Sequence, residues 1–119
     1  MKDENLIKDK SKAFAIRIVN LYKYLTLGAD VKEYVISKQV LRSGTSIGAN
    51  VREALRGQSN ADFHAKMNIA LKEASETEYW IELLQETDYI DSNSANSLLT
   101  DNVELIKILT SIVKNSNKK

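Results

Sequence analysis

The chain has 119 residues, of which 43% are hydrophobic and 28% are charged, and it contains no cysteine. This composition is typical of a globular domain rather than a disordered chain, and the lack of cysteine excludes disulfides and thiolate metal sites. The formal net charge of +1 argues against a protein that is dominated by nucleic-acid binding, although one basic face is still compatible with it.

The sequence is poor in the residues that interrupt helices. It has four glycines and no proline, whereas folds built from strands and turns usually need both. Three weak spots divide it into four predicted helices, at about 5–25, 31–57, 60–86 and 93–114. We therefore predict an all-α fold, an antiparallel up-down four-helix bundle. Residues 1–119 are interpreted as a single domain with a polar C-terminal tail at about 115–119.

The first predicted helix has one apolar stripe at helical spacing, formed by Phe14, Ile18, Leu21 and Leu25. The second begins with a capping box, in which Asp30 caps the helix and Glu33 reaches back from three residues on. The third predicted helix begins with a capping box of the same kind, formed by Ser59 and Asp62.

The second predicted helix contains the run LRSGTSIGANVREAL at 41–55, in which each glycine costs roughly 0.5–1 kcal/mol relative to alanine. Its apolar residues nevertheless keep helical phase: Ile36, Val40, Gly44, Ile47, Val51 and Leu55. A polar edge follows beside them: Gln39, Ser43, Ser46, Asn50 and Gly57. Because a break would reset the phase, we predict a continuous helix in which Gly44 permits close approach of a neighbour. The alternative is a kink or short loop at 44–48.

The third predicted helix has two apolar rows. The core row is Phe63, Met67, Ala70, Ala74, Ile81 and Leu84. The second row alternates apolar groups with carboxylates: Ala65, Ile69, Glu73, Glu76, Trp80 and Leu83. A bundle helix needs only one buried stripe, and tryptophan is enriched at interfaces. We therefore predict a subunit interface at Ile69, Glu73, Glu76, Trp80 and Leu83, in which a carboxylate pairs with an arginine of a neighbouring copy. The alternative is that Trp80 fills a wide core.

The fourth predicted helix, capped near Asp91 or Ser92, has its large apolar residues on one side: Leu98, Leu99, Ile106, Leu109, Ile112 and Val113. No apolar run approaches the ~20 residues that span a bilayer, and the first residues do not form a signal peptide. We therefore expect a cytoplasmic location and no membrane partner.

Residues 42–84, RSGTSIGANVREALRGQSNADFHAKMNIALKEASETEYWIELL, resemble the four-helix bundle family of 23S ribosomal RNA intervening sequence proteins. The signature residues are Ser46, Ile47, Asn50 and Glu53, together with LKEASETEYW at 71–80. Ala54 departs from the glycine that many members have there. Since buried polar groups need partners, we expect the Asn50 amide to bond to another helix.

The resemblance implies a homopentamer without enzymatic activity or cofactor, from a family encoded within bacterial large-subunit ribosomal RNA genes and elsewhere in genomes. It also implies a relationship to the accessory proteins of diversity-generating retroelements, which bind nucleic acid beside a reverse transcriptase. Those relatives are strongly basic, whereas this chain is nearly neutral.

The residues themselves also argue against an enzyme. Carboxylate-bridged metal bundles use Glu-x-x-His pairs on two helices, and His64 is the only histidine, so we expect it at the surface and predict no metal site. No nucleotide-binding fingerprint is present. The interpretation is therefore a non-enzymatic homo-oligomeric assembly or scaffold with an unidentified protein or nucleic-acid partner.

The alternative interpretation is a nucleic-acid-binding accessory factor. Its predicted RNA- or DNA-binding residues are the basic face of the second helix with an extension onto the third: Lys38, Arg42, Arg52, Arg56, Lys66 and Lys72. Phosphate contacts of this kind weaken with salt. The competing explanation for these cations is that they are solvated or paired with carboxylates.

Overall fold

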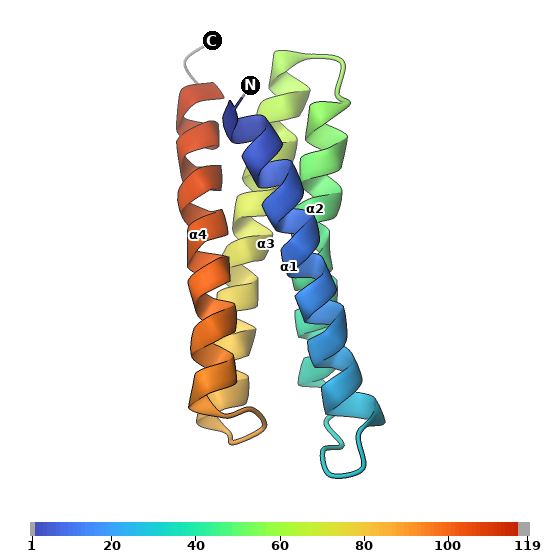
Figure 1. Ribbon diagram of the computed structural model, residues 1–119. Coiled ribbons are helices and arrows are strands. Elements are labelled where there is room, and N and C mark those ends of the chain that lie inside the picture. Colours follow the sequence, from blue (N-terminus) through green and yellow to red (C-terminus); the bar gives the residue numbers. More distant parts are fainter. Residues whose placement is uncertain (1, 117–119) are drawn as a thin grey trace.

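The computed structural model describes residues 2–116, and these form four helices in an up-down arrangement (Figure 1). The helices are α1 (Lys2–Leu27), α2 (Ile36–Leu55), α3 (Asn60–Glu86) and α4 (Ser92–Ser116). Each packs on its sequence neighbours, and α1 also contacts α4 along a smaller area. The predicted antiparallel four-helix bundle is thus confirmed, as an elongated body of 50 × 21 × 19 Å.

The predicted stripes form the core. The largest fully buried side chains include Phe14 and Ile18 of α1, Ile47 of α2, Met67 of α3 and Leu109 of α4. Ile36, Leu55 and Phe63, also predicted for the core, are only partly buried and pack at its edge.

The run at 41–55 lies within one uninterrupted helix, as its apolar phase predicted. Gly44 is buried at the contact between α1 and α2, where a β-carbon would lie 2.7 Å from Cγ1 of Ile18. The glycine therefore allows the two helices to approach closely, and the alternative of a kink or loop at 44–48 is wrong.

The predicted start of α2 is wrong by five residues. Residues 31–35 are not helical, and Asp30 does not cap the helix. Instead the Glu33 carboxylate accepts hydrogen bonds from the backbone N–H of Ser37 at 2.6 Å and of Val35 at 3.2 Å. A carboxylate at a helix N-terminus satisfies unpaired N–H groups and the positive end of the dipole, so α2 begins only after Glu33.

The other boundaries lie close to their predictions. Ser59 caps α3 by accepting from the N–H of Asp62 at 3.0 Å, and Asp91 accepts from the N–H of Ser94 at 2.7 Å at the start of α4. α2 ends at Leu55 rather than at 57. α4 continues to Ser116 rather than ending at 114, and residues 117–119 of the predicted tail lie outside the described part of the chain.

Candidate functional site

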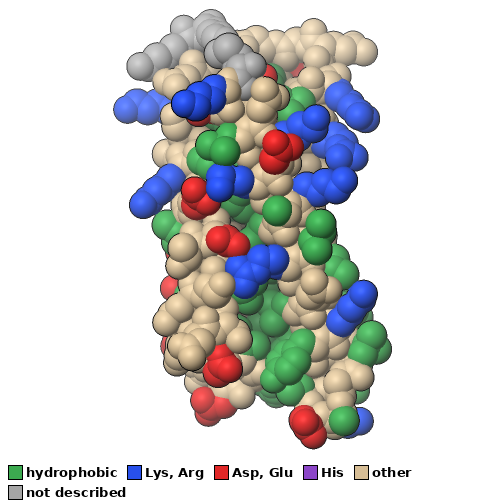
Figure 2. Space-filling model, in the orientation of Figure 1, with side chains coloured by type: hydrophobic (Ala, Val, Ile, Leu, Met, Phe, Trp, Pro, Cys, Tyr) green, Lys and Arg blue, Asp and Glu red, His purple; other side chains and the backbone are tan. Residues whose placement is uncertain are grey.

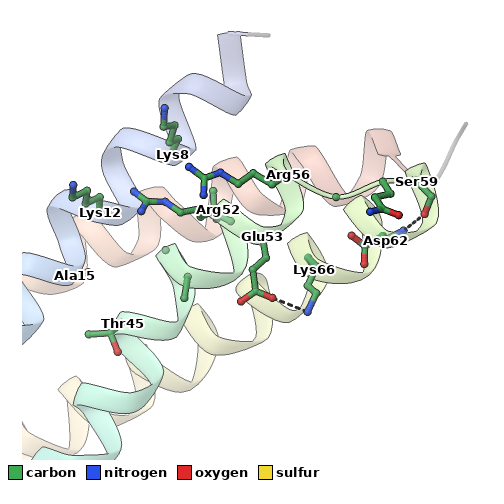
Figure 3. Close-up of a pocket in the computed structure, with 15 residues that line it drawn as sticks. Lys8, Lys12, Ala15, Thr45, Arg52, Glu53, Arg56, Ser59, Asp62 and Lys66 are labelled. Carbon is green, nitrogen blue, oxygen red and sulfur yellow. Dashed lines mark hydrogen bonds and ion pairs between the residues drawn. The ribbon is translucent and has the colours of Figure 1, made fainter.

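A basic groove of about 1150 Å³ lies between α1, the second half of α2 and the start of α3 (Figure 3). Five cationic side chains line it: Lys8, Lys12, Arg52, Arg56 and Lys66. Lys8 and Lys12 come from α1, whereas Arg52 and Arg56 come from α2, and each pair is four residues apart. Residues at this spacing share one helix face, so the two helices present their cations to the same groove.

Small residues form the floor of the basic groove. Ala15, Gly48 and Ala49 lie among its lining residues. At Gly48 the helices are in ordinary contact, because a β-carbon there would lie 3.4 Å from the carbonyl oxygen of Ser11. Short side chains at the contact leave open space above it, and the long cationic side chains stand around that space.

The charge of the groove is only partly balanced. Its two carboxylates are Glu53 and Asp62, and Glu53 pairs with Lys66 at 2.9 Å. The hydrogen bond and the charge of Glu53 raise the pKa of Lys66. The other four cations make no ion pair within residues 2–116. Five cations against two carboxylates give the groove a formal charge of +3, whereas the whole chain has +1.

The structure divides the six residues predicted for nucleic-acid binding. Arg52, Arg56 and Lys66 line the basic groove, but Lys38, Arg42 and Lys72 do not. Two arginines of the predicted basic face, Arg52 and Arg56, therefore lie in the groove, and Lys38 and Arg42 of that face lie outside it. Sequence reasoning also missed Lys8 and Lys12, because only the packing of α1 on α2 brings them beside the arginines.

Arg42 instead joins α2 to α3 within the same chain. Its guanidinium donates to Glu73 at 3.0 Å and to Glu76, and the bond to Glu76 is the main reason that the pKa of Arg42 is raised. Trp80 Nε1 donates to the same Glu76 carboxylate at 2.8 Å. Glu73 and Glu76, predicted to pair with an arginine of another copy, thus have an arginine partner inside the chain.

The remaining predicted interface residues lie along the outer side of α3. Ile69 is 42% exposed, while Leu83 and Trp80 are half-buried. Trp80 also packs on the edge of the core and meets the ring of Tyr79 edge to face. Trp80 therefore combines partial core packing, the alternative considered for it, with an exposed edge.

A second apolar surface was missed in the sequence. It comprises exposed residues of α1 and of the α1–α2 connection: Ile16, Val19, Leu27, Tyr34 and Val35. Leu27 is 76% exposed and Val35 is 71% exposed. Figure 2 shows hydrophobic side chains gathered in the lower half of the face drawn there, the half in which α1 ends. Their signal is weak in the sequence because they interrupt a polar helix face singly.

The signature residues have structural contacts. Ile47 is fully buried, whereas Ser46 donates to the carbonyl of Arg42 and the Asn50 amide donates to the carbonyl of Ser46 at 2.9 Å. The expectation that Asn50 bonds to another helix is therefore wrong. A short polar side chain can satisfy itself on the carbonyl four residues earlier in its own helix. Glu53 is the signature residue that connects helices, through Lys66.

Within residues 2–116, no group of three or more metal-ligating side chains is placed to hold a metal ion. His64 is half-buried, and its Nδ1 lies 2.7 Å from Ser116 Oγ at the end of α4. None of the four helices described is both long enough and apolar enough to cross a membrane.

Residues 3–111 match the family of 23S rRNA-intervening sequence proteins, so the chain belongs to this family. A similar solved structure is the crystal structure of a protein with unknown function from the S23 ribosomal protein family of Bacteroides thetaiotaomicron VPI-5482. It is 59% identical, the match covers 94% of this chain and 98% of that one, and the TM-score is 0.90. No curated protein matches the sequence. The family resemblance found in residues 42–84 is thereby confirmed.

Proposed function

We propose that the protein is a non-enzymatic scaffold that assembles from identical copies into a closed ring. The observation that carries this proposal is a pair of apolar surfaces on different helices. One is the α3 surface of Ile69, Trp80 and Leu83, and the other is the α1 surface around Ile16 and Leu27. Exposed apolar patches of this kind usually mark interfaces.

The positions of the two surfaces favour a ring over a two-fold dimer. α1 and α3 are diagonal in the bundle, because each of them packs on α2 and on α4, so their outer sides face away from one another. A contact between the α3 surface of one copy and the α1 surface of the next is heterologous. Heterologous contacts close into rings when the rotation permits. The expected number of five copies comes from the family resemblance.

Light scattering coupled to size exclusion tests the assembly. We expect the wild-type mass to be five times the 13.4 kDa of one chain. Ile69→Arg on α3 and Ile16→Arg on α1 should each reduce the mass to that of one chain. Ser111→Arg is the control, because Ser111 is exposed on α4 and belongs to neither surface. A monomeric wild type overturns the proposal.

Mixing the two arginine variants tests the direction of the contact. Ile69→Arg keeps an intact α1 surface, and Ile16→Arg keeps an intact α3 surface. If the two surfaces bind each other, an equimolar mixture should form a complex of two chains that neither variant forms alone. A mixture that stays monomeric would contradict the contact between the α3 surface and the α1 surface. Whether the copies assemble in another way would still follow from the wild-type mass.

A further inference from the structure

We propose that the basic groove between α1 and α2 binds the phosphate backbone of nucleic acid. Lys8, Lys12, Arg52 and Arg56 would contact phosphates, and this function goes beyond the assembly of the ring. The groove includes Arg52 and Arg56 of the face predicted along the second helix, whereas Arg42 of that face is held by Glu73 and Glu76.

The charge distribution favours a polyanion as the occupant. Figure 3 shows the side chains of Arg52 and Arg56 extending toward the side of the groove where Lys8 and Lys12 stand. Like charges four residues apart on a helix repel each other. No carboxylate pairs with these four cations within the described residues. An incoming row of phosphates would relieve the repulsion and release counterions, which drives binding of this type.

The shape of the groove favours an extended ligand over a small phosphorylated molecule. Small-molecule sites bury most of their ligand in a concave, mainly apolar pocket. This groove is open and is lined by long cationic side chains around a floor of Ala15, Gly48 and Ala49. A chain of phosphates can lie along it and contact cations from both helices.

The lining also predicts that the groove does not read sequence. None of its lining residues is aromatic, so bases have no ring on which to stack, which is the usual device of single-strand readers. Contacts to phosphates position a nucleic acid without specifying its bases. Oligouridylate and oligoadenylate should therefore bind with similar affinity.

Fluorescence anisotropy with labelled oligouridylate and oligoadenylate RNA of about 20 nucleotides tests the site. Four phosphate contacts predict a slope near −2.8 in a plot of log affinity against log salt, and thus a loss of roughly 50-fold between about 50 and about 200 mM salt. The variant that carries Lys8→Gln, Lys12→Gln, Arg52→Gln and Arg56→Gln should lose at least about tenfold in affinity at the lower salt concentration, together with most of the slope.

A second quadruple variant is the matched control. It removes the same charge from exposed lysines outside the groove, with Gln at Lys23, Lys32, Lys38 and Lys107. Its affinity should stay within about twofold of wild type, because charges beyond about 10 Å are largely screened. Circular dichroism and the oligomer mass of both variants establish that fold and assembly are intact.

Three results would overturn the proposal. They are the absence of RNA binding by the wild type at low salt, an equal loss in the two quadruple variants, and tighter binding of a labelled poly-glutamate peptide than of RNA. The last would assign the groove to an acidic protein partner. All three results are measured independently of the oligomer mass, so the proposal of a ring and the proposal of nucleic-acid binding can be disproved separately.

Discussion

Gly44 of α2 packs directly against Ile18 of α1, and a β-carbon at Gly44 would lie 2.7 Å from Cγ1 and 2.8 Å from Cγ2 of Ile18. Both residues are buried, and a β-branched side chain has little freedom to rotate away. Gly44→Ala should therefore lower the free energy of unfolding by about 1–3 kcal/mol. This cost exceeds the gain of up to about 1 kcal/mol in helix propensity. Urea unfolding followed by circular dichroism measures the change.

Two comparisons isolate the contact. Gly48→Ala gains the same helix propensity, but its β-carbon meets nothing nearer than 3.4 Å, so it should leave stability unchanged or raise it. In an Ile18→Ala background Cγ1 and Cγ2 are gone and only Cβ remains close, at 3.2 Å, so Gly44→Ala should cost clearly less than in the wild type. If Gly44→Ala costs the same in both backgrounds, the contact with Ile18 is not its cause.

Thr77 of α3 and Ser43 of α2 form a polar contact inside the core, with 2.9 Å between their hydroxyl oxygens, and both residues are fully buried. Thr77 also donates to the carbonyl of Glu73 at 2.8 Å. Thr77→Val should cost about 1–3 kcal/mol, because it leaves the Ser43 hydroxyl buried without this partner. Ser43→Ala should cost less than about 1 kcal/mol, since Thr77 keeps Glu73.

The double variant that carries Thr77→Val and Ser43→Ala tests this contact, with stability measured by thermal or urea unfolding. When both hydroxyls are absent, neither is left unsatisfied, so the double variant should be more stable than Thr77→Val alone. Strictly additive losses would show that the two hydroxyls do not stabilise each other.

The sequence predicted the fold correctly where the apolar residues are the buried ones. The phase of Val40, Ile47 and Val51 predicted an unbroken helix, and the structure has one. The same reasoning placed Ser43 on a polar edge beside the core and omitted Thr77 from the core, because a hydrophobic pattern does not reveal hydroxyls that satisfy one another across two helices.

The errors at the start of α2 and at the basic groove have a related cause. The capping-box pattern predicts that Glu33 reaches back to Asp30, three residues earlier, whereas its carboxylate reaches forward to Ser37 from a segment outside the helix. Lys8 and Lys12 were ordinary lysines in the sequence. They line the groove only because of the way α1 is rotated against α2, which places them beside Arg52 and Arg56. Periodicity gives the inner face of each helix but not which outer faces meet at a groove.

Glu33 should make stability depend on pH in the acidic range. Burial raises the pKa of this carboxyl, but the N–H groups of Ser37, Ile36 and Val35 outweigh burial and hold it below its ordinary value of 4.5. A lowered pKa in the folded state stabilises the fold above 4.5, and this contribution is lost as pH falls through the folded-state pKa.

Glu33→Gln is the variant that tests this linkage. It should cost about 1 kcal/mol at neutral pH, because the amide oxygen is a weaker cap than a carboxylate at the start of a helix. The difference from wild type should shrink below pH 4.5 as the carboxylate becomes protonated. Urea titrations at several pH values give the stability of the wild type and of the variant as functions of pH. A difference in stability that is independent of pH would contradict the role of the charge.

Glu76 should report its own protonation through Trp80, the only tryptophan in the chain. Its carboxylate accepts from the indole Nε1 at 2.8 Å and from Arg42. The hydrogen bond from Arg42 is the main reason that the pKa of Glu76 lies below its ordinary value of 4.5, with the bond from Trp80 next. Protonation removes the charge that both donors bind, so the emission of Trp80 should shift with a midpoint below 4.5.

Two variants assign that fluorescence transition. Glu76→Gln should abolish it, because the carboxylate that accepts from the indole is replaced by an amide, which does not titrate. Arg42→Gln should keep the transition but move its midpoint to higher pH, since the largest cause of the lowered pKa of Glu76 is gone. Far-ultraviolet circular dichroism recorded at the same pH values separates local titration from acid unfolding. A midpoint that Arg42→Gln leaves in place would show that the hydrogen bond from Arg42 does not lower the pKa of the carboxyl that Trp80 senses.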